Sequence, residues 1–292
     1  MGAMVIMLVY TVNLFIVYGW SLLARFYSHR DNNSLVKSKP SWLLSLIPLS
    51  SLILVSGLRY GVGTDYWRYV SIYQQASHTD LSRLMGGKDP GFTLLCWVLA
   101  HISANPQLMF LITSTITNVL IVATLRDFAK PFEMGMFLYI GTYAYYGSFN
   151  ATRQYIAAAF GFWAFRYLVQ GKFIRYTLAV LVASTFHLSA LLLIPVYFFA
   201  RTKAWSKITW LLIISCIVMF VFFDEVVMST FNFVQITQYE HYRNILLDPA
   251  SRGANPLRFC AALVPVIFAY VKQDSIRKRF RGADILMNMC IL

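Results

Sequence analysis

Three stretches of the chain are continuously apolar and carry no charged side chain: residues 4–24, 107–125 and 208–223. Each is close to the roughly 20 residues that an α-helix needs to cross the hydrocarbon core of a bilayer. Only helices and closed barrels satisfy every backbone polar group in lipid, and barrel strands alternate between apolar and polar residues. The pattern therefore predicts membrane-spanning helices. The first stretch lacks a charged start and a small-residue cleavage site, so we interpret it as a retained helix and not a signal peptide.

Shorter apolar stretches predict further crossings at residues 41–58, 133–148 and 152–169. Residues 92–103 are too short to cross comfortably, and we interpret them as a re-entrant or interfacial segment that returns to the side it came from. Residues 176–200 have basic clusters at both ends, which favours a hairpin of two short helices with its tip at residues 186–189. Irregular backbone at that depth is tolerated only inside protein or beside a water-filled cavity.

The composition supports the same fold class. Hydrophobic residues make up 58% of the 292 residues and charged residues 13%, against about 25% charged in ordinary soluble domains. We therefore predict an all-α, polytopic transmembrane helical bundle that forms a single domain over residues 1–292. It would contain about 8–10 membrane segments when the re-entrant and hairpin pieces are counted.

The charge distribution predicts which side of the membrane each loop occupies. The net charge is +13, and the tendency of basic residues to stay inside explains it without a nucleic-acid partner. Five clusters hold 17 of the 25 Lys and Arg residues: Arg25/Arg30/Lys37/Lys39, Arg126/Lys130, Arg166/Lys172/Arg175, Arg201/Lys203/Lys207 and Lys272/Arg277/Lys278/Arg279/Arg281. Placing all five inside puts the N-terminus, the loops at about 57–90 and 224–256, and the junction at 150–154 on the outer face.

The four cysteines all lie in apolar stretches, and none belongs to a CxxC pair. Their default interpretation is structural packing, and neither a disulfide framework nor a zinc site is indicated.

The segment GLRYGVGTDYWRY (57–69) opens the first outer loop. It places Arg59, Asp65, Tyr66 and Tyr69 next to three glycines that make a tight, adaptable entry. One interpretation is an interfacial aromatic belt with a snorkelling arginine. The other is a loop that binds an anion and a sugar, with Asp65 as a carboxylate base.

Arg153 begins a helix that is apolar for the next three turns, and an arginine there is costly unless it meets a cavity or a partner. Asn150 is a candidate N-cap, and Gln154 follows in the same turn. Together with the helix N-terminus, Arg153 has the chemistry to grip a phosphate. The alternative is an interfacial arginine that only ends the preceding loop.

His187 lies at the tip of the predicted hairpin, and histidine titrates near neutral pH, as a general base must. A histidine that is simply satisfied within the bundle is the alternative. The segment Lys88–Gly91 ends the first outer loop and is typical of a turn. Tyr239, His241 and Arg243 form a polar and aromatic group in the second outer loop, which is either a binding loop or merely solvated.

Four motifs in this order resemble the EpsG family, which comprises Wzy-like polymerases of exopolysaccharide and O-antigen. They are Arg59-x-Gly61-x-Gly63-Thr64-Asp65-Tyr66, Asp89-Pro90-Gly91-Phe92, Asn150-x-x-Arg153-Gln154 and Thr185-Phe186-His187-x-Ser189-Ala190. Family members commonly carry Glu at the position of Asp89. They also tend to be longer, and residues 284–292 resemble the beginning of another crossing helix, so we expect a C-terminal truncation.

The resemblance implies a glycosyltransferase-C-like bundle in the bacterial cytoplasmic (inner) membrane, with its site facing the periplasm or exterior. It implies a polymerase that transfers a polyprenyl-diphosphate-linked glycan to a lipid-linked repeat unit, without a cofactor or metal ion. Asp65 or His187 would be the base, and Arg153 with Arg59 would hold the diphosphate. Tyr66, Tyr69, Asn150 and Gln154 would bind substrate, as would Tyr239, His241 and Arg243. Other polysaccharide export and assembly proteins would be partners.

Three other functions fit parts of the pattern. A flippase or transporter of lipid-linked oligosaccharide also needs arginine and aspartate within the membrane, but it should show internal repeats with paired broken helices. A membrane O-acyltransferase of the same pathway also uses a histidine in a membrane cavity. A scaffold of a polysaccharide assembly complex is the structural alternative if the chain is truncated.

Overall fold

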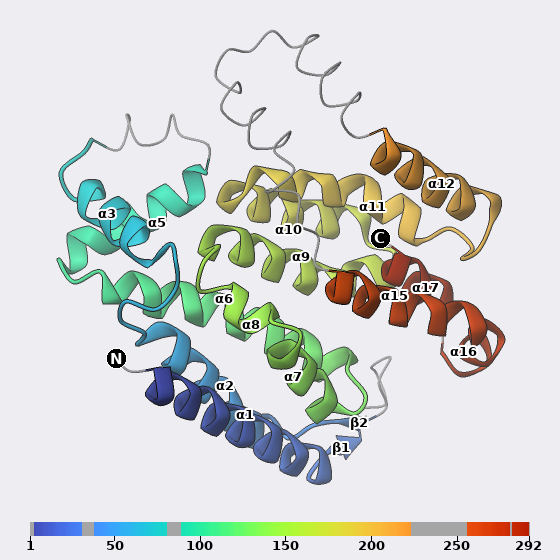
Figure 1. Ribbon diagram of the computed structural model, residues 1–292, viewed down its shortest axis with the longest axis horizontal. Coiled ribbons are helices and arrows are strands. Elements are labelled where there is room, and N and C mark those ends of the chain that lie inside the picture. The colour runs from blue at the N-terminus through green and yellow to red at the C-terminus, as the bar shows by residue number, and fades with distance from the viewer. Residues whose placement is uncertain (1–2, 31–37, 81–88, 223–255, 281, 292) are drawn as a thin grey trace, which may run out of the picture. The chain divides into compact units, whose positions relative to one another are not determined.

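The computed structural model describes residues 3–30, 38–80, 89–222, 256–280 and 282–291 (Figure 1). These residues form helices together with one antiparallel pair of two-residue strands. The chain divides into two compact units, residues 1–194 and 195–292. The predicted loop at 224–256 lies almost entirely outside the described residues.

The first unit contains α1 (Ala3–Phe26), β1 (His29–Arg30), β2 (Ser38–Lys39), α2 (Trp42–Gly57), α3 (Tyr66–Ala76), α5 (Pro90–Ile102), α6 (Gln107–Phe128), α7 (Phe132–Gly141), α8 (Ala144–Gly147), α9 (Thr152–Gln170), α10 (Phe173–Phe186) and the 3-10 helix η1 (Leu188–Leu192). The helix α11 (Leu193–Ala200) begins at the boundary between the units. The second unit continues with α12 (Lys207–Val221), α15 (Pro256–Val271), α16 (Gln273–Arg279) and α17 (Ala283–Ile291).

The predicted crossings at 4–24, 41–58, 107–125, 152–169 and 208–223 all form helices with nearly the same bounds. Two helices of the described residues, at 4–26 and 107–128, are long and apolar enough to cross a membrane by length and composition. The predicted single crossing at 133–148 is wrong as one helix. It breaks between α7 and α8, where Tyr143 adopts a left-handed conformation with φ 70°.

The long helices of the first unit pack as successive neighbours in the order α1, α2, α6, α9 and α10 (Figure 1). Gln107 at the start of α6 donates to the Arg59 carbonyl just beyond α2, at 3.2 Å, and Arg126 near its end lies over the Trp42 ring. The helices α2 and α6 are therefore antiparallel. We call the end of the unit where α2 ends and α6 and α9 begin the site end, and the opposite end the basic end.

The basic end brings three of the predicted basic clusters together. Arg25 forms an ion pair with Glu133 at 2.8 Å. Asp127 accepts ion pairs from both Lys39 and Arg166, each at 3.4 Å. These contacts join the ends of α1, α6 and α9 to β2 and the start of α7, so the clusters share one end of the unit, as the predicted topology requires.

Both ends of α5 lie near the site end. Asp89, just before α5, contacts Arg153 at the start of α9. Gln107, just after α5, contacts the Arg59 carbonyl, and the Arg59 guanidinium in turn reaches Thr152. Because Thr152 and Arg153 are neighbours, both ends of the single helix α5 lie near this end of the unit, and the re-entrant or interfacial interpretation of residues 92–103 stays a prediction.

The chain also reverses at His187, as predicted for residues 176–200. The helix α10 ends at Phe186, and His187 takes an extended conformation before η1 begins. The Tyr176 hydroxyl near the start of α10 then donates to the Leu193 carbonyl at 2.7 Å. This contact closes the hairpin and places His187 at its tip.

Many large apolar side chains point outwards from the helices of the first unit. Phe15, Leu43 and Ile174, on three different helices, are each more than 70% exposed. Exposure of so many large apolar side chains is typical of a surface that meets lipid or another protein.

Candidate functional site

Asp89 and Arg153 form a short ion pair at the site end. Arg153 Nη1 donates to Asp89 Oδ2 at 2.6 Å, at the short end of charge-assisted hydrogen bonds. The Asp89 side chain is only 9% exposed and the Arg153 side chain 29%. Asp89 occupies the N-cap position of α5, but its side chain makes no capping bond there. Its carboxylate is instead committed to Arg153.

His187 approaches the same carboxylate from the hairpin tip. Its Nδ1 lies 3.8 Å from Asp89 Oδ1, so the two oxygens of Asp89 face two different partners. This separation is longer than a hydrogen bond. The His187 side chain is 36% exposed. The Asp89 carboxylate is therefore the most buried of the three groups, and the guanidinium and the imidazole are more accessible.

Close packing between α5 and the end of α10 brings Asp89 and His187 together. A Cβ atom built on Gly91 would lie 2.8 Å from the Thr185 Cβ and 3.0 Å from the Thr185 carbonyl oxygen. No side chain fits there without a shift, so only glycine allows this approach. The Arg153 guanidinium also lies 5.8 Å from the centre of the Phe92 ring.

Asn150 ties the first outer loop to the start of α9. Its Oδ1 accepts from the Thr64 backbone N–H at 2.8 Å and from the Thr64 hydroxyl at 3.3 Å. The prediction that Asn150 caps α9 is therefore wrong: the N-cap position belongs to Ala151, and the Asn150 amide serves the loop. Gly63 makes the contact possible with φ +106°, because a Cβ there would lie 2.9 Å from Asn150 Oδ1.

Arg59 lies in the interior of the site end and is only 7% exposed. Its guanidinium donates to the Ser56 carbonyl at 2.8 Å, to the Phe149 carbonyl at 3.2 Å and, at 3.5 Å, to the Thr152 hydroxyl. Burial lowers the pKa of Arg59 to about 10, so the group keeps its charge at neutral pH. These contacts join α2, the segment before α9 and α9 itself.

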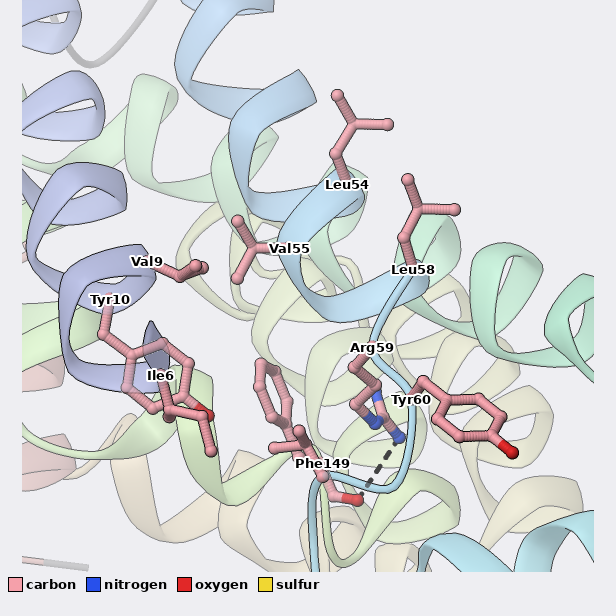
Figure 2. A pocket seen from close by; sticks show the side chains of 10 residues that line it. Ile6, Val9, Tyr10, Leu54, Val55, Leu58, Arg59, Tyr60 and Phe149 are labelled. Atoms are coloured by element: carbon pink, nitrogen blue, oxygen red, sulfur yellow. Dashed lines mark hydrogen bonds between the residues drawn. The ribbon is translucent and has the colours of Figure 1, made fainter. Parts of the chain in front are cut away.

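A cavity of about 250 Å³ adjoins Arg59 (Figure 2). Its walls come from α1, from the end of α2 and from Phe149, and most of them are apolar. Figure 2 shows Arg59 beside Phe149 at one side of this space, with Val9, Val55 and Leu54 across it. Arg59 Nε is buried and has no hydrogen-bond partner among the described residues.

The remaining predicted site residues differ in their burial and in their contacts. Asp65 precedes α3, is half-buried and makes no capping bond with that helix. Tyr66 and Tyr69 are buried: Tyr66 stacks on Phe110 with ring centres 4.7 Å apart, and Tyr69 meets Phe92 edge-on at 5.6 Å. Gln154 is exposed. Tyr239, His241 and Arg243 lie outside the described residues.

Asp89 is the functional candidate that the sequence pattern assigned to a turn and not to the site. The signal that could have singled it out is the scarcity of acids, since only 12 of 292 residues are Asp or Glu. A carboxylate beside an apolar helix in such a chain needs a partner. Which partner it finds depends on the packing of α5 against α9 and α10, which spacing does not reveal.

Within the described part of the chain, no three His, Cys, Asp or Glu side chains gather as a metal site would require. The cluster of Asp89, Arg153 and His187 offers a guanidinium that binds anions, an imidazole that accepts a proton and a carboxylate that positions both.

Comparison with known families gives one match. The model of the EpsG family matches residues 42–292, which include all four motifs and every residue of the cluster. No curated protein and no solved structure matches the chain.

Proposed function

Because this chain belongs to the EpsG family, we propose that it is a membrane polysaccharide polymerase. In this proposal it transfers a growing glycan from a polyprenyl diphosphate to the non-reducing end of a lipid-linked repeat unit. The family supports a polymerase-like role in a lipid-linked polysaccharide context. The observation that supports the specific reaction is the cluster of Arg153, Asp89 and His187 where the four motifs meet.

The transfer needs a base and a partner for negative charge. The acceptor hydroxyl loses its proton to His187 while its oxygen forms a bond to the anomeric carbon of the donor sugar. The bond from that carbon to the diphosphate breaks, and the electron pair leaves with the diphosphate. Arg153 stabilises the leaving diphosphate, as positioned cations do in phosphate chemistry. Asp65, at the entrance of α3, remains the alternative base.

Asp89 positions the two reacting groups in this mechanism. A guanidinium carries five N–H donors, and the ion pair with Asp89 uses an Nη1 hydrogen, which leaves donors for diphosphate oxygens. The second carboxylate oxygen faces His187 Nδ1 and would hold the ring with Nε2 towards the acceptor, as carboxylates orient histidines elsewhere. A small closure from 3.8 Å would complete that bond when substrate binds.

The membrane placement follows from charge. The basic end would face the cytoplasm under the positive-inside rule, so the site end would face the periplasm of a bacterial cytoplasmic membrane. A polyprenyl chain would then stay in the bilayer while its diphosphate meets Arg153. Other export and assembly proteins would receive the product on that side.

Glycan length in the producing strain tests this function. We expect Arg153→Ala and His187→Ala to abolish long polymer and to leave single lipid-linked repeat units, seen as loss of the ladder on a gel. Arg175→Ala and His101→Ala are matched controls because both side chains are exposed and, in the described part of the chain, neither makes a hydrogen bond or ion pair with Asp89, Arg153 or His187. All variants should reach the membrane at equal levels by immunoblot.

The outcomes separate the alternatives. Loss of every outward-facing repeat unit would identify a flippase, and normal polymer that lacks acyl groups would identify an O-acyltransferase. An unchanged ladder in both cluster variants, at wild-type protein levels, would refute the assigned site.

A further inference from the structure

A second cavity, of about 490 Å³, lies at the basic end of the first unit, far along the helices from the cluster. It opens between the end of α1, Pro40 shortly before α2 and the turn that joins α6 to α7. Its volume falls within the range of about 300–1,000 Å³ that is common for small-molecule sites. The catalytic proposal assigns no role to this cavity.

Two basic residues line this cavity, and among the described residues only one of them has an acidic partner. Arg25 Nε pairs with Glu133 at 2.8 Å, and Glu133 is only 4% exposed. The charge of Arg25 therefore compensates a buried carboxylate. Lys130 also lines the cavity, in the turn after α6, where it is exposed. Its charge adds a positive potential to the cavity.

The surroundings of the cavity strengthen that potential. Arg126 donates from Nε to the Pro40 carbonyl at 3.0 Å, and Pro40 is one wall of the cavity. Nearby, Asp127 lies between Lys39 and Arg166. Among the described residues that make these contacts or line the cavity, five are basic and two are acidic. A cavity with such an excess attracts anions.

Apart from Ser28, the rest of the wall is apolar. Pro40, Ala129, Pro131 and Phe132 contribute it. Next to the cavity, the last turn of α1 exposes Phe26 by 68%, and the Arg25 guanidinium lies 5.0 Å from the centre of its ring. An anion that also carries apolar groups would satisfy both parts of this surface, whereas free phosphate would use only the charge.

We propose that this cavity binds the phosphodiester head group of an anionic phospholipid from the inner leaflet. The phosphate lies by Lys130 and Arg25, and the glycerol and first methylenes lie against Pro131 and Phe132. Basic pockets between helices on the cytoplasmic side are suited to such head groups. The inference rests on the membrane placement proposed above but not on the catalytic roles, so it can fail while the polymerase function holds.

Lipid binding to the purified full-length protein tests the inference. The detergent-solubilised protein is titrated with phosphatidylglycerol or phosphatidylcholine, and bound lipid is counted by native mass spectrometry. We expect phosphatidylglycerol to bind preferentially and Lys130→Glu to weaken it about tenfold. Lys172→Glu makes the same charge change at an exposed position of the same end and should leave binding unchanged.

Two further measurements complete this test. Lys130→Gln should lose less affinity than Lys130→Glu, and it replaces that variant if the charge reversal prevents folding. Excess glycerol phosphate should not displace the bound lipid, and displacement at millimolar levels would show a site for free phosphates instead. Equal binding of the two lipids, or equal losses in the Lys130 and Lys172 variants, would overturn the inference.

Discussion

At the scale of single residues, Asp89 has the largest consequence for the proposed chemistry. It is the buried member of the cluster, and its two carboxylate oxygens face Arg153 and His187. A buried carboxylate that pairs with a more exposed cation fixes where that cation points. The account therefore assigns Asp89 a positioning role and leaves contact with substrate to Arg153 and His187.

Asp89→Asn should lower polymerisation by about 10- to 100-fold, a loss typical of groups that only orient others. The substitution keeps the shape but removes the charge that holds Arg153. Asp89→Glu is the matched control, because it keeps the carboxylate and its charge. Initial rates on a lipid-linked repeat unit measure both. Equal activity of the Asn and Glu variants would show that the charge of Asp89 is irrelevant.

Two glycines in the first outer loop allow the stability cost of backbone strain to be measured apart from that of steric crowding. Both have positive φ, but only Gly63 lies against Asn150 and the Phe149 carbonyl, whereas Gly61 faces open space. Gly61→Ala should cost about 1–2 kcal/mol of stability through backbone strain alone. Gly63→Ala should cost more, because the added methyl also displaces the Thr64–Asn150 contact. Thermal unfolding in detergent compares them, and equal costs would contradict this assignment.

The residues of the cluster differ in how readily the sequence discloses them. Arg153 and His187 stand out because an ionisable side chain in an apolar segment is expensive and needs a reason. Asp89 was hidden by Pro90 and Gly91, since Asp-Pro-Gly is an ordinary turn sequence. The capping role predicted for Asn150 was wrong, because N-cap preferences consider only neighbours in sequence. The Asn150 side-chain oxygen instead accepts a hydrogen bond from Thr64, which is distant in sequence.

At the scale of elements, the approach of α5 to α10 determines whether the cluster exists. Alanine normally stabilises a helix by about 1 kcal/mol relative to glycine, yet a Cβ on Gly91 would collide with Thr185. Gly91→Ala should therefore lose activity, because it pushes Asp89 away from His187. Gly141→Ala, whose nearest neighbour would lie at 3.8 Å, is the control and should stay active. The in-cell glycan ladder distinguishes them, and a normal ladder for Gly91→Ala would refute the packing.

Continuous apolar stretches predicted the long helices with nearly correct bounds, because length and composition alone decide such segments. It did not predict the break between α7 and α8, since nothing in residues 133–148 marks Tyr143 as left-handed. The hairpin tipped by His187 was predictable from a different signal. Basic clusters at both ends of residues 176–200 required the chain to return to its starting side.

At the scale of the whole molecule, charge segregation links the fold to the proposed membrane topology. Within the first unit, Arg25, Lys39 and Arg166 meet at one end, while Arg153 lies at the other. This separation came from helix packing and agrees with the sides assigned from sequence. Binding sites for an exported glycan and for an inner-leaflet lipid would then occupy opposite ends of the same bundle.

Cysteine labelling tests that topology. In a background with Cys216, Cys260 and Cys290 replaced, Cys96 is the remaining described cysteine and is buried. A membrane-impermeant thiol reagent added to cells with a permeable outer layer should label Asn105→Cys and Gln154→Cys. It should label Lys172→Cys only after the cytoplasmic membrane is disrupted. A crossing by α5 would place both of these positions on the cytoplasmic side, so labelling of both only after that disruption would contradict the topology.

The most direct test of the central claim is polymerisation by the purified protein in liposomes. The substrate is a lipid-linked repeat unit taken from the producing strain, and the products are resolved by length. We expect the wild-type protein to elongate the glycan and to release polyprenyl diphosphate. We also expect the Arg153→Ala variant to insert into the same liposomes but to elongate the glycan at least about 100-fold more slowly. Elongation by Arg153→Ala at the wild-type rate would contradict the central claim.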